Sequence, residues 1–182
     1  SRHIVIDIKD GGRALIRVTD DGEGIRRADL LLDFVSQATS MFRSNHDLTS
    51  ITPMGFRGEA LPSVPPVPRV QVATATRADA VGAQVSLVGG VSQGIADAPP
   101  VAGTRIEVAE LFYNQPARKK FLKSVPTEFS HISAVIQQTA LAWPSVHFRL
   151  THNGHDALNY SAVETDRERI MQVYQPAFVE RT

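Results

Sequence analysis

Short runs of alternating apolar and polar residues, separated by glycine-rich turns, constrain the fold of this chain more than any other feature. Alternation with a period of two is typical of β-strands that have one buried face. Two runs enclose Asp10-Gly11-Gly12, two enclose Asn153-Gly154, and one is followed by Gly89-Gly90. The apolar positions of all the runs are Ile4, Ile6, Ile8, Ala14, Ile16, Val18, Val70, Val72, Ala83, Val85, Leu87, Ile106, Val108, Val146, Phe148, Leu150, Leu158 and Tyr160. We therefore expect a sheet built mainly from antiparallel hairpins.

Three stretches have the periodicity of helices instead. Helical spacing begins after Asp29, an amphipathic stripe runs from about Thr127 to Leu141, and Thr165 has capping-box spacing to Glu168. The apolar residues of these stretches are Leu30, Leu31, Phe34, Val35 and Ala38, then Phe129, Ile132, Ile136 and Ala140, then Ile170, Met171 and Val173. Residues 40–53 are polar and aperiodic, and the four prolines in residues 62–68 exclude a regular helix there. The pattern predicts an α+β fold, a two-layer sandwich with helices on one face of a mainly antiparallel, mixed sheet.

Composition narrows the classes of function. The 182 residues include no cysteine, which excludes disulfides, thiolate zinc sites and a cysteine nucleophile. Nineteen basic residues balance nineteen acidic ones, so any contact with DNA would need a local basic patch. No apolar run approaches the roughly 20 residues of a membrane span, and no signal-peptide pattern opens the chain, so we expect an intracellular protein. His152 and His155 have no third ligand nearby in the sequence, and we expect no metal site there.

The sequence Asp20-Asp21-Gly22-Glu23-Gly24-Ile25 follows a predicted strand directly. Asp20 would place a carboxylate at the end of that strand, and the glycines would let the backbone come close to a ligand. A fixed carboxylate can accept hydrogen bonds from an exocyclic amine such as that of adenine. Taken alone, the motif is also explained by a plain turn between a strand and a helix.

Two further motifs contain glycine. Gly55-Phe56-Arg57-Gly58-Glu59-Ala60-Leu61 can present backbone N–H groups to phosphate, and its spacing excludes a P-loop. Arg57 could pair with a phosphate or form a surface salt bridge. Gly103-Thr104 precedes a predicted strand and carries little information alone.

The densest basic stretch lies within residues 111–123 and contains Arg118, Lys119, Lys120 and Lys123. It predicts either a patch for the phosphate backbone of DNA or the solvated start of a helix. We expect the aromatic residues of the stretch, Phe112 and Phe121, to anchor it to the core rather than to stack on bases.

Together and in this order, these elements resemble the N-terminal ATPase region of the MutL family of DNA mismatch repair proteins. That family belongs to the GHKL superfamily, with gyrase B, heat-shock chaperone and histidine-kinase ATPases. Residues 20–24 match the D-x-G-x-G element of the superfamily, and residues 55–61 match the MutL motif G-F-R-G-E-A-L. Residues 111–122 closely resemble the MutL signature L-F-Y-N-T-P-A-R-R-K-F-L, and residues 37–40 lie where the family has H-A-T-S. The resemblance covers essentially the whole chain.

The resemblance implies a single ATP-binding domain over residues 1–182, with ATP and Mg²⁺ as ligands. Asp20 would bind the adenine amine, and Gly22, Gly24 and Thr104 would lie near the base, directly or through water. A lid would wrap the phosphates, become ordered when ATP binds and help two copies to dimerise. The lid residues would be Thr39, Ser40, Gly55, Phe56, Arg57, Gly58, Glu59, Ala60 and Leu61. The basic residues 118–123 would meet DNA, and a MutS-type mismatch recognition protein would be a further partner.

The same resemblance implies that part of the catalytic machinery lies outside the chain. The family's general-base Glu and Mg²⁺-binding Asn would precede Ser1, and a Lys that reaches the γ-phosphate would follow Thr182. We therefore expect a nucleotide-binding core that has no catalytic residue of its own and hydrolyses ATP negligibly by itself. Asp21 replaces the family's Asn and adds a negative charge beside the pocket. Gln37 replaces His, Met41 replaces Lys, and the prolines of residues 62–68 replace a short helix.

A competing interpretation is a non-catalytic homologue that keeps the fold as a module for contact with protein or DNA. The missing general base, Asp21 and the prolines favour this interpretation. Asp20, residues 55–61 and Gly103-Thr104 oppose it. A gyrase-type topoisomerase or a histidine kinase agrees less well, because residues 111–122 match neither.

Overall fold

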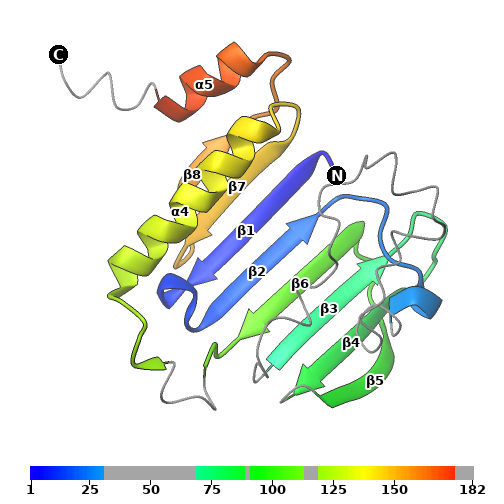
Figure 1. Cartoon of the computed structure of the whole chain (residues 1–182). Coiled ribbons are helices and arrows are strands. Elements are labelled where there is room, and N and C mark those ends of the chain that lie inside the picture. Colours follow the sequence, from blue (N-terminus) through cyan, green and yellow to red (C-terminus); the bar gives the residue numbers. More distant parts are fainter. Residues whose placement is uncertain (31–68, 89–90, 113–118, 175–182) are drawn as a thin grey trace, which may run out of the picture.

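Eight strands form one sheet in the computed structural model, which describes residues 1–30, 69–88, 91–112 and 119–174 (Figure 1). Their order across the sheet is β5-β4-β3-β6-β2-β1-β7-β8. The pair β1 and β7 is parallel, and the other neighbours are antiparallel, which confirms the predicted mixed sheet. The strands are β1 (His3–Lys9), β2 (Leu15–Asp20), β3 (Arg69–Ala75), β4 (Gly82–Val88), β5 (Val91–Ala98), β6 (Gly103–Ala109), β7 (His147–His152) and β8 (His155–Tyr160).

The hairpins form where the alternation of apolar residues predicts them. β1 and β2 are joined through a short 3-10 helix, η1 (Asp10–Gly12), and β7 and β8 through Asn153-Gly154. The antiparallel pairing of Val88 with Val91 confirms a hairpin around residues 89–90, which themselves lie outside the described residues. The alternation did not delineate β5, because its sequence VSQGIADA interrupts the apolar pattern with Gly94 and polar residues.

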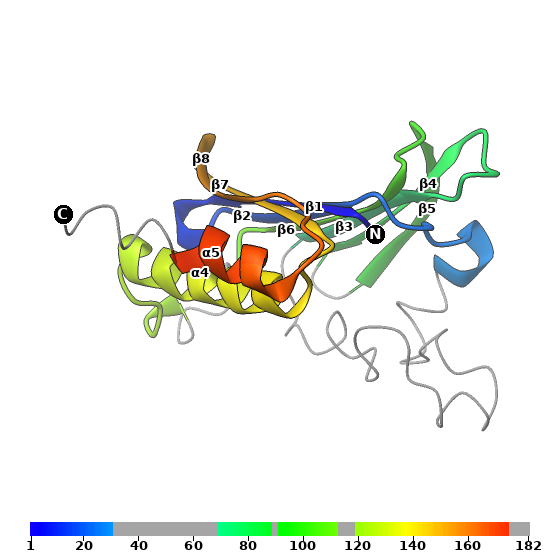
Figure 2. The same ribbon diagram turned by 90° about the horizontal axis from the view of Figure 1, so that it is seen from above.

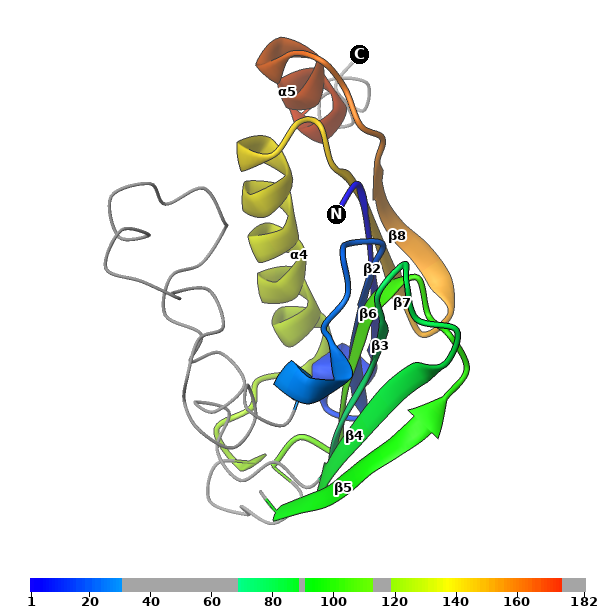
Figure 3. The same ribbon diagram turned by 90° about the vertical axis from the view of Figure 1, so that its right-hand side faces the viewer.

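Both long helices, α4 (Val125–Ala142) and α5 (Asp166–Tyr174), lie on one face of the sheet, as predicted (Figures 2 and 3). α4 begins two residues before the predicted start, because Ser124 caps it by accepting a 3.4 Å hydrogen bond from the backbone N–H of Thr127. Its apolar stripe, Phe129, Ile132 and Ile136, packs against the core of β1, β2 and β7.

The capping box of α5 is confirmed, but two of the apolar residues that follow it are exposed. The backbone N–H of Glu168 donates to Oγ1 of Thr165 over 3.3 Å, and the backbone N–H of Thr165 donates to Glu168 over 3.2 Å. Ile170 and Met171 are 50% and 43% exposed. α5 instead buries Arg169, which donates to the carbonyl oxygens of Pro144 and Val146, and burial lowers the pKa of this guanidinium.

The helix-facing side of the sheet has two apolar clusters. One lies under α4 and contains Ile6, Ile8, Ala140, Phe148, Leu150 and Tyr160. The other lies on β3 and β4 and contains Leu30, Val70, Val72, Ala83 and Val85. Residues 27–30 are helical, as the spacing after Asp29 predicts. The rest of that predicted helix, the loop of residues 40–53 and the prolines of residues 62–68 lie outside the described residues.

Candidate functional site

Three polar side chains lie side by side at one end of the helix-facing side of the sheet. The register pairs Asp20 of β2 with Thr104 of β6, and Thr104 with Thr74 of β3. Because side chains alternate along a strand, these three residues share the face that carries the apolar clusters. Thr104 is 8% exposed, Thr74 is 1% exposed and Asp20 is half-buried. We call these three residues the polar row.

The carboxylate of Asp20 is held in place by the turn that follows it. Its Oδ1 accepts hydrogen bonds from the backbone N–H of Gly22 over 2.7 Å and from Oγ of Ser1 over 2.8 Å. None of the described residues donates a hydrogen bond to Oδ2 of Asp20. Asp20 therefore has a fixed position and keeps one acceptor oxygen for a ligand.

Two glycines let the turns around the polar row come together. Gly103 has a φ of +93°, and a Cβ there would lie 2.1 Å from the carbonyl oxygen of Asp20. Gly24 has a φ of +75°, and a Cβ there would lie 2.1 Å from the carbonyl oxygen of Ala75. The glycines are thus required by close contact between backbone segments of the protein itself. For Gly24, the sequence motif had suggested close approach of the backbone to a ligand instead.

Gly22 has a different surrounding. A Cβ at this position would lie 2.6 Å from Oδ1 of Asp20 and 2.7 Å from Oγ of Ser1, both of which are side-chain atoms. A side chain at Gly22 would therefore displace the carboxylate of Asp20 before it displaced the backbone.

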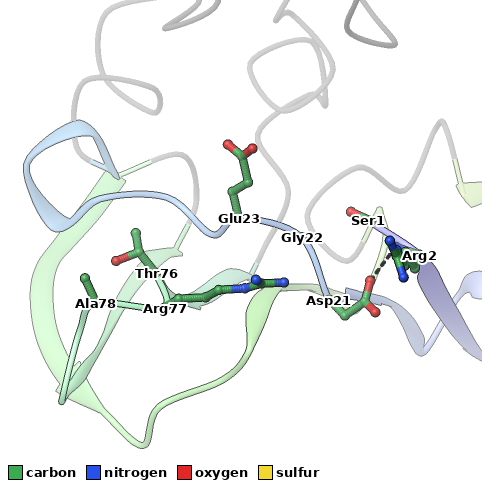
Figure 4. A pocket seen from close by; sticks show the side chains of 8 residues that line it. All are labelled: Ser1, Arg2, Asp21, Gly22, Glu23, Thr76, Arg77 and Ala78. Atoms are coloured by element: carbon green, nitrogen blue, oxygen red, sulfur yellow. Dashed lines mark hydrogen bonds between the residues drawn. The ribbon is translucent and has the colours of Figure 1, made fainter.

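Two open cavities adjoin the polar row where the turns meet. Their volumes are about 540 and 410 Å³, and Asp21, Gly22, Thr76 and Arg77 line both. The larger cavity is completed by Ser1, Arg2, Glu23 and Ala78, and Figure 4 shows the side chain of Arg77 extending toward Asp21. The smaller cavity is completed by Ala75, Asp79, Pro100, Val101, Ala102 and Gly103. Asp20, Thr74 and Thr104 line neither cavity, but their neighbours in sequence Asp21, Ala75 and Gly103 do.

Asp21 has a structural role that the sequence did not indicate. Its Oδ1 accepts from the backbone N–H groups of Arg2 and His3 over 2.6 and 2.9 Å, and its Oδ2 lies 2.6 Å from Nδ1 of His3. Burial raises the pKa of this carboxyl, but the hydrogen bonds from His3 and Arg2 outweigh that effect and hold the pKa well below its usual range. Asp21 thus fastens the start of β1 to the end of β2.

The basic residues of the candidate DNA surface lie at the other end of the β1–β2 hairpin. Lys119, Lys120 and Lys123 are exposed, and the guanidinium of Arg13, next to η1, donates to the carbonyl oxygen of Lys123. Phe121 is 85% exposed, so the expectation that it anchors this segment to the core is wrong. The backbone contact with Arg13 ties the segment to the fold without a buried ring at that position. Phe112 is half-buried, and Arg118 lies outside the described residues.

The predicted lid lies entirely outside the described residues. Its residues are Thr39, Ser40, Gly55, Phe56, Arg57, Gly58, Glu59, Ala60 and Leu61.

His152, at the end of β7, has structural contacts. His152 stacks on Phe129 with ring centroids 4.0 Å apart, and its Nε2 accepts from the backbone N–H of Gly11 over 3.3 Å. Within the part of the chain that the structure describes, no three histidine or acidic side chains come close enough to hold a metal ion. No helix in that part combines the length and apolar character needed to cross a membrane.

Comparison with known proteins gives consistent results for sequence and fold. The DNA mismatch repair protein MutL of Acidobacterium capsulatum is 43% identical over 171 residues, which are 94% of this chain and 26% of that protein. MutL of Halalkalibacterium halodurans is 44% identical over 174 residues, which are 96% of this chain and 27% of that protein. The solved ATPase domain of Aquifex aeolicus MutL, complexed with ADP, superimposes with a TM-score of 0.76 and 26% identity. That match covers 96% of this chain and 62% of the solved one, whereas no protein-family model matches.

The mixed sheet, with α4 and α5 on one face and an aspartate at the end of β2, has the fold of a GHKL-type ATPase domain. Within that class, the chain corresponds in sequence and fold to the ATPase region of MutL. It spans about a quarter of the length of the curated relatives that it matches.

Proposed function

We propose that this chain is the ATP-binding core of a MutL-type DNA mismatch repair protein and that its polar row receives the adenine base. The observation that carries the proposal is the pairing of Asp20 with Thr104 at the end of the sheet. Asp20 offers a fixed carboxylate oxygen and Thr104 offers a hydroxyl beside it. A carboxylate and a hydroxyl in adjacent cross-strand positions suit the exocyclic amine of adenine, which has two hydrogens to donate.

The wider cycle of the protein is part of the same proposal. ATP binding would order the lid and promote dimerisation of two copies, and this change would pass mismatch recognition by a MutS-type protein to later steps of repair. Because the relatives are named for DNA mismatch repair, we place the protein with the DNA in the bacterial cytoplasm. Mg²⁺ would arrive with the nucleotide phosphates.

Calorimetric titration of the 182-residue chain with ATP tests the binding site. Asp20→Asn should weaken ATP binding by about tenfold, because a hydrogen bond to a neutral amide is weaker than one to a carboxylate by about 1–1.5 kcal/mol. Asp21→Asn is the matched control, since the neighbouring carboxylate is engaged by Arg2 and His3. The control should bind ATP as well as the unchanged chain does, or slightly better. Equal losses in the two variants would contradict the role of Asp20.

If the unchanged chain does not bind ATP, the result supports the competing interpretation of a non-catalytic interaction module. Asp20 and Thr104 would then serve the fold alone.

The DNA contact is tested by the salt dependence of duplex binding. Lys120→Gln should flatten the slope of log affinity against log salt by about 0.9 if this lysine neutralises one phosphate. Arg167→Gln, which removes an exposed cation on α5, is the control and should leave the slope unchanged. The sequence of the duplex should not matter, because phosphate contacts carry no base information. An unchanged slope for Lys120→Gln would mean that residues 119–123 form a solvated segment ahead of α4 without a phosphate contact.

A further inference from the structure

Thr74 is the one member of the polar row that the sequence motifs did not single out. It lies in β3 at the position opposite Thr104 and is 1% exposed. Its hydroxyl contacts both motifs of the candidate nucleotide site: Ile25, which ends the turn after Asp20, and the Gly103-Thr104 pair.

The hydrogen bonds of this hydroxyl can be assigned by counting. The backbone N–H of Ile25 donates to Oγ1 of Thr74 over 2.9 Å. Oγ1 of Thr74 donates its single proton to the carbonyl oxygen of Gly103 over 2.9 Å. Oγ1 of Thr104 lies 3.1 Å from Oγ1 of Thr74. A hydroxyl has one proton and two lone pairs, so Thr74 can only accept from Thr104.

This assignment fixes the direction in which the hydroxyl of Thr104 points. Its proton is used toward Thr74, and it presents lone pairs on its other side. Asp20, the cross-strand neighbour of Thr104 on that side, presents carboxylate oxygens that accept hydrogen bonds. The pair formed by Asp20 and Thr104 therefore accepts hydrogen bonds and offers none.

We propose that Thr74 is a positioning residue that sets base selectivity by holding Thr104 as an acceptor. The proposal rests on the function proposed above. With Thr104 held in this way, directly or through one ordered water, the site favours a purine that presents an amine over one that presents a carbonyl at the same position. Without Thr74, the hydroxyl of Thr104 can rotate and donate to a carbonyl.

The test compares ATP with inosine triphosphate, which has a carbonyl where adenine has its amine. Calorimetry gives the ratio of the two dissociation constants for the unchanged chain and for Thr74→Val, which has the same shape without the hydroxyl. We expect the preference for ATP to fall by about three- to tenfold in the valine variant, the effect of one neutral hydrogen bond. Thr74→Ser keeps the hydroxyl and should keep the preference.

Thr151→Val is the matched control for a general loss of stability. Thr151 is 8% exposed, and its hydroxyl donates to Asp7 over 2.7 Å, away from the polar row. This variant should keep the ratio of the unchanged chain. If Thr74→Val does not fold, Thr74→Ala removes the same hydroxyl with a smaller side chain and takes its place.

The outcomes separate the two proposals. If Thr74→Val weakens the binding of ATP and of inosine triphosphate by the same factor, Thr74 only stabilises the fold and the inference is overturned. If the unchanged chain binds neither nucleotide, the proposed function is overturned and this inference with it. A reduced ratio in Thr74→Val that Thr74→Ser restores supports the inference.

Discussion

Two neighbouring rows of residues on the helix-facing side of the sheet carry opposite kinds of side chain. The polar row, Asp20, Thr104 and Thr74, lies two residues along the strands from an apolar row. The apolar row consists of Ile6, Val18, Ile106, Val72, Val85 and Ile95, paired in that order across six strands. The core and the candidate site are thus separated by only two residues along each strand. Because packing of the apolar row fixes the positions of the strands, it also fixes the positions of the polar side chains.

The two rows also differ in the contacts that their buried side chains require. Val72 and Val85 are 0% exposed and need only apolar neighbours, which local alternation supplies. Thr74 is almost as buried, but its hydroxyl requires three partners from two separate segments, the turn at Ile25 and the start of β6. The polar row therefore depends on the register of β3 with β6 and on the turns at Gly24 and Gly103.

The largest expected effect is at Gly103, where the polar row depends on backbone contact. Gly103→Ala adds a Cβ 2.1 Å from the carbonyl oxygen of Asp20 at a φ of +93°. Gly94→Ala is the control, because Gly94 has a φ of +90° and nothing lies within 4 Å of its Cβ position. Gly94→Ala should cost only the conformational strain, about 1–3 kcal/mol. Gly103→Ala should lower the free energy of unfolding by more than twice as much, measured by denaturant titration. Equal losses of unfolding free energy in the two variants would show that the backbone contact between Gly103 and Asp20 does not exclude a Cβ.

An intermediate effect is expected when a hydroxyl is moved into the apolar row. Val72→Thr keeps the shape of the side chain but buries a hydroxyl among Val70, Val85 and Ile106, at a cost of about 1–3 kcal/mol. ATP affinity of the folded protein should stay unchanged. The pair of Val72→Thr and Thr74→Val, two residues apart on one strand, therefore separates stability from selectivity. A change in the ratio of nucleotide affinities in Val72→Thr would contradict the separation of the two rows.

The parts of the fold that the sequence predicted are those decided by local patterns. Alternation located seven of the eight strands and implied the hairpins, and the stripe of Phe129, Ile132 and Ile136 located α4, because each pattern repeats within a few residues. The capping box before α5 is equally local.

What the sequence missed depends on contacts between distant segments. In the sequence Thr74 is one of several polar residues in a strand, and only the register of β3 with β6 shows that it lies against Thr104. In the sequence Asp21 is only part of a turn motif, and its structural role follows from its contacts with Arg2 and His3 at the start of β1. The exposure of Phe121 and the burial of Arg169 likewise follow from tertiary packing and not from residue type. Asp20, Gly24 and Thr104 could be chosen as site residues because the order of the motifs resembles a known family.

The smallest expected effect distinguishes the two adjacent carboxylates of the turn after β2. Asp20 belongs to the polar row, whereas Asp21 serves the fold by binding Arg2 and His3. Because the pKa of Asp21 is lowered in the folded state, its contribution to stability is fully present above the unfolded pKa of about 3.9 and is lost as the pH falls toward the folded pKa. The side chain of Asp21 is 38% exposed, so solvent screening limits the contribution to about 1 kcal/mol.

Asp21→Asn should therefore lower the free energy of unfolding by about that amount at pH 7, and the difference from the unchanged chain should shrink below pH 4. Denaturant titrations at pH 7, 4 and 3 measure it. Glu164→Gln is the control, because this exposed carboxylate has no hydrogen-bond partner among the described residues, and it should change stability little at any of these pH values. A difference for Asp21→Asn that stays constant from pH 7 to pH 3 would mean that the ionised carboxylate does not provide the tie. The loss of stability in Asp21→Asn would then have a steric cause. The difference between the roles of Asp20 and Asp21 would be supported only by the ATP-binding measurements.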